Sequence, residues 1–265
     1  MRKKSIKKII YSFLNLLSAA VRVLFRLPRV SILTYHSIGD NRALFTVSPT
    51  EFAWQLKYLK KHNFQVVSLG ELIGKLKNQE KIEDKTVALT FDDGYADNFL
   101  EAWPLLKKYN FPATIFLSTD FIGRSFTNSQ GVKIGVLNQD QIKEMASSGL
   151  IELGSHTHTH PRLEDISRAD FIQEVNLSKE IIEQLTGQSC RFFAYPRGYF
   201  REEFFGILKE LGFEAAFSVK EGLISNKDNL FLLKRNFIYG AGGCFQFKGK
   251  LTYSVGFYNW LKSKL

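Results

Sequence analysis

Short apolar runs alternate with longer amphipathic stretches along the body of the chain. The runs are rich in β-branched or aromatic side chains and are bounded by glycine, proline or polar residues, which is typical of buried strands. They predict strands at residues 30–36, 64–67, 87–89, 113–117, 150–156, 192–195, 215–219 and 231–233.

Between these runs, apolar residues recur three or four positions apart, which predicts amphipathic helices. Ser48, with Glu51 three residues later, is an expected helix cap, and so are Asn138 and Ser167. Further helices are expected from about residues 69, 98 and 202. Repeated strand–helix units predict an α/β fold with a parallel sheet. The chain length favours an irregular (β/α) barrel of about seven strands over an open doubly wound sheet.

Two stretches interrupt this alternation. Residues 77–85 are polar and predict a linker, and residues 121–137 contain glycine and serine without a clear period. We expect the second stretch to form a long loop over one end of the domain. No glycine-rich phosphate loop follows the first strand, which weakens a nucleotide-binding interpretation.

The positive charge of the chain lies at its two ends. Residues 1–30 carry eight basic side chains and no acid, and residues 229–265 carry six and no acid. The body between them therefore has a net charge of −4, although the whole chain carries +10. A mildly acidic body without a nucleic-acid-binding motif argues against a nucleic-acid partner. The two cysteines do not have metal-site spacing.

Residues 1–29 form a basic, apolar segment ahead of a body that we expect to span residues 30–240. The small residues 18–20 after a short apolar run resemble the end of a secretory signal peptide. However, the helical spacing of apolar residues continues past Arg22 and Arg26, so we favour an amphipathic helix at a membrane interface. The expected location is peripheral membrane association, with secretion or a periplasmic location as the alternative.

Residues 241–265 form a basic, aromatic tail. Aromatic residues mixed with lysine are found on membrane-facing surfaces. A half-buried terminal helix fits the same residues, so both interpretations of the tail stay open.

Side chains suited to chemistry follow several of the predicted strands. In a parallel barrel the carboxyl ends of the strands share one face, where active sites form. Asp92 and Asp93 are neighbours, and neighbouring strand residues point to opposite faces, so the two carboxylates can serve different tasks. An Asp-Gly pair is also a common turn, so Asp93 and Gly94 alone do not decide the function. The candidates are His36, Asp92, Asp93, His156, His160 and Tyr195.

Three of the five histidines lie within residues 155–160. If the strand continues through them, His156 and His158 share a face, as in HxH-type metal hydrolases. If the chain turns after Ser155, His156 and His160 come together, and Pro161 favours this turn. Two imidazoles and one carboxylate leave one position open for water, which is how catalytic zinc sites are built.

Three segments resemble motifs of the NodB-homology polysaccharide deacetylases, carbohydrate esterase family 4. They are TFDDG at residues 90–94, SHTHTH at 155–160 and FAYPRG at 193–198. The resemblance covers residues 30–240 in architecture and about 84–240 by motif. It implies a metal site at Asp93, His156 and His160, and a general base at Asp92. Zn²⁺ is the expected metal, with Co²⁺ or another divalent ion as the alternative.

The resemblance also implies groups around the substrate. The segment around Tyr195 and Pro196 would form a groove wall, and the Tyr195 backbone N–H would help to hold the oxyanion. Arg191, or less favourably Arg197, would orient Asp92.

One departure from the family pattern concerns the general acid. Many members draw it from a histidine in a C-terminal motif, but this chain has no histidine after His160. The segment TYHSI at residues 34–38 is similar to the N-terminal motif of circularly permuted biofilm-polysaccharide deacetylases, whose histidine is the acid. LKRNFI at residues 233–238 is similar to their late arginine motif. These likenesses imply His36 as the acid, with Arg235 in support.

The expected function is a metal-dependent hydrolase that removes N-acetyl groups from the sugars of a polysaccharide or lipid-linked glycan and releases acetate. Its partners would be this glycan and a membrane surface. The alternatives are another HxH-type metal hydrolase and an inactive glycan-binding homologue. The sequence has no serine elbow or reactive-cysteine setting, which argues against covalent catalysis.

Overall fold

The computed structural model describes residues 29–41, 43–127 and 131–252. The predicted amphipathic helix of residues 1–29, apart from its last residue, and residues 253–265 of the predicted tail lie outside these ranges. Within the described ranges, no helix is both long and apolar enough to cross a membrane.

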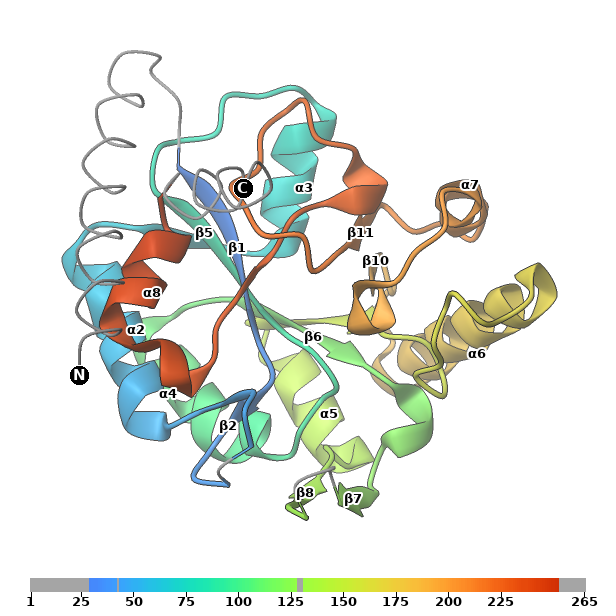
Figure 1. Cartoon of the computed structure of the whole chain (residues 1–265), viewed down its shortest axis with the longest axis horizontal. Coiled ribbons are helices and arrows are strands. Elements are labelled where there is room, and N and C mark those ends of the chain that lie inside the picture. The colour runs from blue at the N-terminus through green and yellow to red at the C-terminus, as the bar shows by residue number, and fades with distance from the viewer. Residues whose placement is uncertain (1–28, 42, 128–130, 253–265) are drawn as a thin grey trace, which may run out of the picture.

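One curled sheet of eight parallel strands lies at the centre of the molecule (Figure 1). The strands run in the order β11-β10-β9-β6-β5-β1-β12, and β4 pairs with the amino-terminal half of β5. This arrangement confirms the predicted irregular (β/α) barrel. The strands are β1 (Val30–Tyr35), β4 (Gln65–Val67), β5 (Thr86–Phe91), β6 (Ala113–Leu117), β9 (Ile151–Ser155), β10 (Phe192–Ala194), β11 (Ala215–Phe217) and β12 (Asn236–Phe237).

The segment from Leu233 to Phe237 closes this sheet into a barrel. Leu233 bridges to Phe217 of β11, and Asn236 pairs with Leu33 of β1. The strand predicted at residues 231–233 is therefore misplaced. Residues Leu230–Leu232 form a short 3₁₀ turn capped by the side chain of Asn229, and pairing begins only after it.

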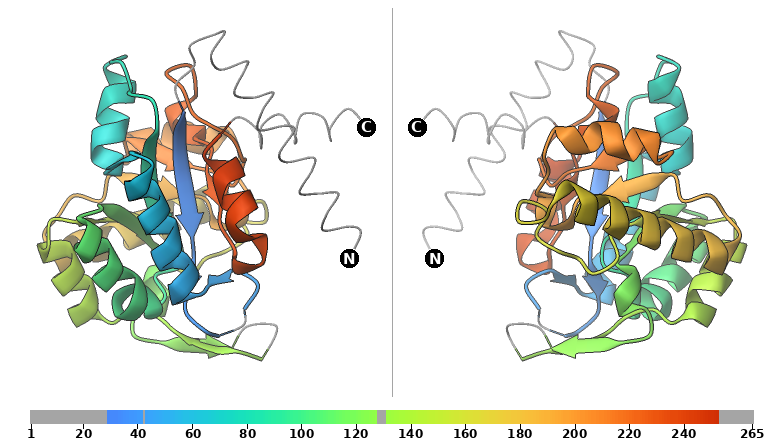
Figure 2. Two further views of the ribbon diagram at one scale, coloured as in Figure 1. Left: turned by 90° about the vertical axis from the view of Figure 1, so that its left-hand side faces the viewer. Right: turned by 90° about the vertical axis from the view of Figure 1, so that its right-hand side faces the viewer.

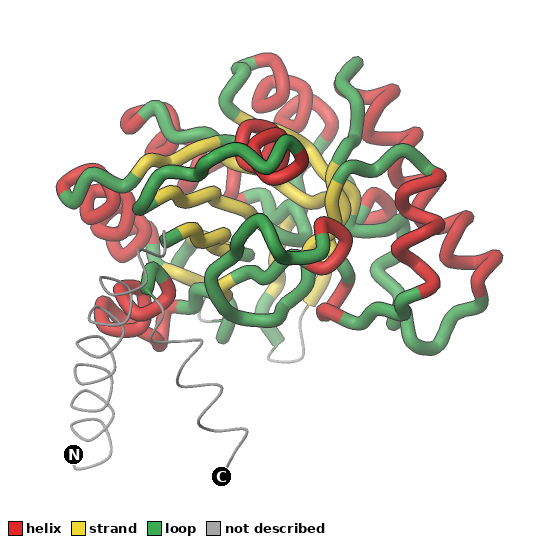
Figure 3. The backbone as a smooth tube through the Cα atoms, turned by 90° about the horizontal axis from the view of Figure 1, so that it is seen from above, coloured by secondary structure: helices red, strands yellow, loops and turns green. Residues whose placement is uncertain are grey.

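Helices surround the sheet, as Figures 2 and 3 show from three directions. The predicted caps are confirmed: Ser48, Asn138 and Ser167 each accept a hydrogen bond from a backbone N–H of the first helical turn. The helices are α2 (Pro49–Lys61), α3 (Leu69–Lys77), α4 (Trp103–Tyr109), α5 (Gln139–Ser147), α6 (Arg168–Thr186), α7 (Glu203–Glu210) and α8 (Gly243–Lys250). Helix α8 buries Phe247 and contacts α2, so this part of the predicted tail is a half-buried helix.

Short elements lie over the carboxyl ends of the strands. The region predicted as a long loop contains an antiparallel hairpin, β7 (Ser125–Thr127) and β8 (Lys133–Gly135). Its strands are too short to produce an apolar alternation, which is why the sequence did not indicate them. A second small pair, β2 (Ser37–Ile38) and β3 (Thr46–Val47), follows β1. A π-helical turn, Asn98–Ala102, precedes α4.

Alternating residues of the strands pack against different neighbours. Leu89 and Phe91 of β5 belong to the cluster that includes α2, α4, α5, α6 and α7. Ala88 belongs to a second cluster, with Phe116, Phe217 and the apolar residues of α3. Asp92 continues the Ala88 side of the strand, so its side chain is expected on the inner face of the barrel, away from the helices of the first cluster.

The closing segment is held by a buried side chain. Asn236 donates to Ser31 Oγ at 2.9 Å and to the carbonyls of Gly222 and Lys250, and it accepts from Gly222 N–H at 3.0 Å.

We expect Asn236→Ala to lower the free energy of unfolding in urea by about 2–4 kcal/mol, because several buried polar groups lose their partner. Asn78→Ala, at an exposed helix end, should change it by less than about 0.5 kcal/mol. Equal effects of the two substitutions would contradict this role for Asn236.

Candidate active site

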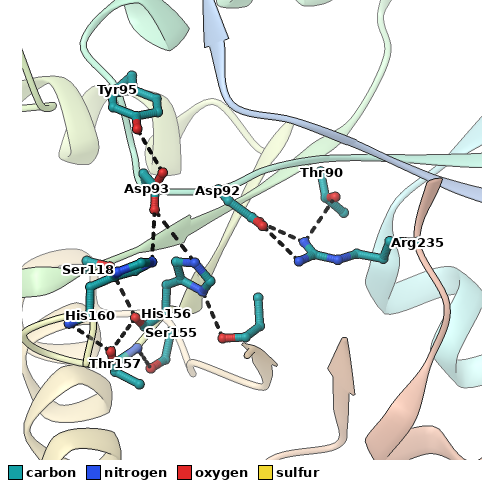
Figure 4. A network of polar contacts seen from close by, with 11 residues as sticks. Thr90, Asp92, Asp93, Tyr95, Ser118, Ser155, His156, Thr157, His160 and Arg235 are labelled. Carbon is teal, nitrogen blue, oxygen red and sulfur yellow. Dashed lines mark hydrogen bonds and ion pairs between the residues drawn. The ribbon is translucent and has the colours of Figure 1, made fainter. Parts of the chain in front are cut away.

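Five of the candidate residues meet where the parallel strands end (Figure 4). Asp92 and Asp93 follow β5, His156 and His160 follow β9, and Arg235 lies in the segment that closes the barrel. His36 directly follows β1, which pairs with β5 along its whole length.

Asp93, His156 and His160 form a cluster suited to a metal ion. One ligand atom from each lies within 4.8 Å of the others. The Nε2 atoms of His156 and His160 are both 3.6 Å from Asp93 Oδ1. Four tetrahedral ligands at zinc bond lengths of about 2.0–2.2 Å lie about 3.3–3.6 Å apart. The spacing and the chemistry of this donor set therefore fit a divalent metal ion such as zinc.

The chain turns after Ser155, which brings His156 and His160 together. Thr157 and His160 adopt positive φ angles of 68° and 58°, so the strand does not continue through the cluster. The ring of His158 instead contacts Thr119 Oγ1 at 2.9 Å. Of the two arrangements left open by the sequence, the structure has the turn.

His156 is oriented for binding by its second ring nitrogen. Its Nδ1 lies 2.8 Å from the carbonyl of Ala194, so Nδ1 carries the proton and Nε2 is left to face Asp93. Burial lowers the pKa of His156 to about 4, although Asp92 opposes this shift. The ring is therefore neutral near pH 7, which is the form that binds metals.

The backbone at Asp93 is unusual. Asp93 has a φ of 69°, and Gly94 has a φ of 65° with a hypothetical Cβ only 2.5 Å from Leu117. Only glycine fits there without displacing Leu117. Tyr95 O–H then donates to Asp93 Oδ2 at 2.9 Å. The Asp-Gly pair thus forms a turn and also directs the Asp93 carboxylate towards the histidines.

Asp92 forms a buried, two-point ion pair with Arg235. The guanidinium donates to Asp92 Oδ1 at 2.7 Å and to Oδ2 at 2.8 Å, and both side chains are at most 4% exposed. It also lies 5.3 Å from the ring centroid of Phe116. Burial by itself would raise the pKa of Asp92, but Arg235, His156 and His36 oppose it and lower the pKa to about 2. Asp92 is therefore a carboxylate throughout the neutral range.

The expected role of Arg191 is not supported by its position. Arg191 precedes β10 and lies at the amino-terminal end of the sheet, where it pairs with Glu152 at 3.1 Å and with Glu214. It cannot orient Asp92 from there. Arg197 does not take this place either, because Arg235 occupies both oxygens of Asp92.

Tyr195 also differs from its expected role. Its N–H donates to the carbonyl of Phe217 at 3.0 Å, which continues the β10–β11 pairing, so this N–H is not available to an oxyanion. Its ring is fully buried and packs on Phe193 and Phe200, and its hydroxyl donates to Phe231 O. Strand alternation places Tyr195 on the outer face of the barrel, in the core rather than in a groove wall. Pro196, the other residue expected there, is also buried.

His36 lies between aromatic side chains next to the carboxylates. Its ring is 5.0 Å from that of Phe237 and 5.8 Å from that of Phe45. The preceding carbonyl, that of Tyr35, accepts a hydrogen bond from Asp92 N–H at 3.0 Å. Among the described residues, the buried Nδ1 of His36 has no hydrogen-bond partner.

Two residues that the sequence did not single out hold the backbone around His36. Asn98 Nδ2 donates to the His36 carbonyl at 2.8 Å. Asp97 accepts from Ser37 Oγ at 2.5 Å and from Ile38 N–H at 3.1 Å. Burial raises the pKa of Asp97 to about 6, although these hydrogen bonds oppose the shift. The only signal for Asp97 and Asn98 was their position just after the acid pair.

Comparison with known proteins identifies the family. Residues 79–216 match the family model described as polysaccharide deacetylase. The chain belongs to the polysaccharide deacetylase family. This membership confirms the family expected from the three motifs, and the chain is accordingly an enzyme, a hydrolase of the deacetylase class.

Individual members of the family are similar over most of the chain. A putative polysaccharide deacetylase of Bacillus subtilis, YxkH, is 32% identical over 207 residues, which is 78% of this chain and 70% of the relative. The poly-β-1,6-N-acetyl-D-glucosamine N-deacetylase of Staphylococcus aureus is 29% identical, over 72% of this chain and 67% of the relative.

Solved structures of the family have a similar fold. The Streptococcus pyogenes deacetylase PplD in complex with acetate aligns with a TM-score of 0.70 and 30% identity, covering 80% of this chain and 92% of that one. IcaB from Ammonifex degensii aligns with a TM-score of 0.72 and 25% identity, covering 82% and 94%.

The ion pair predicts a change in pH dependence. In Arg235→Gln, the buried Asp92 loses the cation that lowers its pKa, so the pKa should rise by about 1–3 units. Asp92 would then take up a proton at higher pH, so the acid limb of the plot of kcat/KM against pH should move to higher pH.

Arg191→Gln is the matched control, because it removes an arginine that pairs with Glu152 and Glu214 instead. Its acid limb should coincide with that of the unsubstituted enzyme. If Arg191→Gln moved the limb and Arg235→Gln did not, the assignment of Arg235 would be wrong.

Proposed function

We propose that the chain is a metal-dependent N-deacetylase that acts on a polymer containing N-acetylglucosamine and releases acetate. The observation that carries this proposal is the cluster of Asp93, His156 and His160 next to a second, ionised carboxylate, Asp92. The S. aureus relative is named for deacetylating poly-β-1,6-N-acetyl-D-glucosamine, which supports this choice of substrate class.

Asp93, His156 and His160 would hold the metal. A bound divalent ion would polarise the acetyl carbonyl and acidify water at the site. Asp93 and His160 keep 18% and 19% of their side chains exposed, so a substrate can reach this position. Zn²⁺ suits two imidazoles and a carboxylate, and Co²⁺ is the alternative.

Asp92 would be the general base. As a carboxylate it can accept a proton from the attacking water, and its ion pair with Arg235 keeps it deprotonated and directed. Arg235 is thus a positioning residue that acts through Asp92.

Backbone groups near Pro196 would help to stabilise the oxyanion. Tyr195 N–H is engaged by Phe217, and Pro196 has no N–H. The next backbone donor along this turn is Arg197, which has a left-handed φ of 54°. We assign the role expected of Tyr195 to the Arg197 N–H.

His36 would be the general acid. The leaving sugar amine needs a proton as the C–N bond breaks, and His36 is the remaining imidazole beside Asp92. Its position is held by Asn98 and by Asp97 through Ser37 and Ile38.

The metal ligands and the base can be separated by two substitutions. Asp93→Ala should abolish both metal binding and acetate release. Asp92→Asn should keep the metal and lower kcat by about 10²–10⁴-fold, because it removes only proton transfer. Metal content by elemental analysis and acetate release from N-acetylglucosamine oligomers measure the two effects.

His158→Ala is the control for these variants. It should keep both metal and activity, because His158 faces Thr119 rather than the cluster. Loss of metal in His158→Ala would favour an HxH-type metal hydrolase. Full activity in Asp92→Asn or in metal-free enzyme would disprove the proposed mechanism.

The general acid can be tested by changing the leaving group. 4-Nitrophenolate leaves without protonation, whereas a sugar amine does not. His36→Gln should therefore lower deacetylation of the glycan by about 10²–10⁴-fold while hydrolysis of 4-nitrophenyl acetate stays within about tenfold. A similar loss on both substrates would remove His36 from the acid role.

We also propose that the enzyme works at a membrane surface. This proposal is supported by the basic, apolar sequence of residues 1–29 and by the basic tail.

A further inference from the structure

A basic pocket lies at the amino-terminal end of the barrel, opposite the active site. It has a volume of about 250 Å³. Arg29 directly precedes β1, Phe64 precedes β4, and Lys85 precedes β5. Active-site residues follow the carboxyl ends of β1 and β5, at the opposite end of the barrel. The remaining lining residues come from the end of α2 and the end of α8, namely Tyr58, His62, Lys248, Leu251 and Thr252.

Aromatic rings and cations alternate in this pocket. The rings of Tyr58 and His62 lie 4.1 Å apart, and those of Tyr58 and Phe64 lie 6.4 Å apart. Lys248 Nζ is 5.2 Å from the ring centroid of Tyr58, and Lys85 Nζ is 5.8 Å from that of Phe64. The two ammonium groups therefore lie near adjacent rings of one cluster and line the same pocket.

The hydrogen-bonding capacity of the pocket favours an anion with several oxygens. An ammonium group has three N–H donors, and Lys85 donates one of them to the His62 carbonyl at 2.9 Å. Arg29 packs its guanidinium 5.9 Å from the Phe64 ring, but its ion pair with Asp84 offsets its charge, so Lys85 and Lys248 supply the net positive charge of the pocket. A phosphate group suits such a set of donors.

The surroundings indicate a lipid headgroup as the source of the phosphate. The chain continues from the pocket in both directions, since residues 1–28 precede Arg29 and residues 253–265 follow Thr252. Residues 1–28 include seven basic side chains and no acid. Trp54 of α2 and Phe245 of α8, on the two helices that line the pocket, are 36% and 38% exposed. Exposed aromatic residues beside cations are typical of surfaces that contact a bilayer.

We propose that this pocket binds the phosphate groups of anionic phospholipids at a bilayer surface. Strand β1 has six residues and spans about 20 Å at about 3.3 Å per residue. Binding at its amino-terminal end therefore holds the catalytic end about that far from the bilayer and directs it away from the membrane. The site goes beyond the proposed reaction, because none of its residues contacts the catalytic cluster.

Vesicle binding by the full chain tests the site. The unsubstituted protein should bind vesicles of phosphatidylglycerol mixed with phosphatidylcholine more tightly than vesicles of phosphatidylcholine alone. Lys85→Gln/Lys248→Gln should weaken binding to the anionic vesicles about 30-fold, which corresponds to about 1 kcal/mol for each cation. Acetate release from a soluble oligomer should be unchanged, which separates a failure of this site from a failure of the proposed chemistry.

Lys133→Gln/Lys209→Gln is the matched control, because it removes the same charge at two exposed positions outside the pocket. Its binding should fall by less than about threefold. Equal losses in the two double variants would show general attraction to charge and overturn the site. Release of bound protein by inorganic phosphate, but not by chloride of equal ionic strength, would show a free-phosphate site instead of a membrane site.

The orientation can be tested with a fluorophore on a single exposed cysteine. Cys244 is exposed and Cys190 is buried, so Cys244→Ser provides the background. A label at Lys81→Cys, in the loop before β5, should be quenched by lipid-borne quenchers. A label at Leu44→Cys, in the loop beside His36, should not. Stronger quenching at Leu44→Cys would overturn the proposed orientation.

Discussion

The buried ion pair between Asp92 and Arg235 is the contact on which the site and the fold both depend. Arg235 lies in the segment that bridges β11 to β1, and Asp92 directly follows β5. Closing the barrel therefore brings the arginine to the carboxylate. A buried carboxylate without this partner would be costly and would take up a proton. The pair thus ties the ionisation of the proposed base to completion of the fold.

Strand alternation and backbone strain point the two adjacent carboxylates in different directions, towards different partners. Asp92 is expected on the inner face of the barrel from its place in β5, where it meets Arg235. Asp93 leaves β5 with a positive φ, and His160, five residues after the end of β9, also has one. Such conformations cost of order 1–3 kcal/mol each for non-glycine residues and persist only where the surrounding structure imposes them. Here they bring three ligand atoms to one point.

Two clusters of different chemistry lie at opposite ends of the barrel. At the carboxyl end, carboxylates and imidazoles follow β1, β5 and β9, and at the amino end one pocket is lined by lysine, arginine and aromatic rings. Parallel strands impose this separation, because residues that precede the strands lie at one end of the barrel and residues that follow them lie at the other. An enzyme built in this way can bind a surface through one end and leave the other accessible to a polymer.

The sequence by itself determined the alternation of strands and helices and the helix caps, and its motifs indicated the candidates for the metal cluster through their resemblance to a known family. The strands, helices and caps are local features, since each lies within one short segment whose spacing carries the information, whereas the turn that brings His160 rather than His158 to His156 was decided by the structure. Tertiary structure decided which arginine meets Asp92 and which face Tyr195 occupies. Arg191 was the nearer candidate in sequence, but Arg235 makes the contact across 143 positions. Such a contact depends on strand register and on how the barrel closes, and no local pattern of residues encodes either.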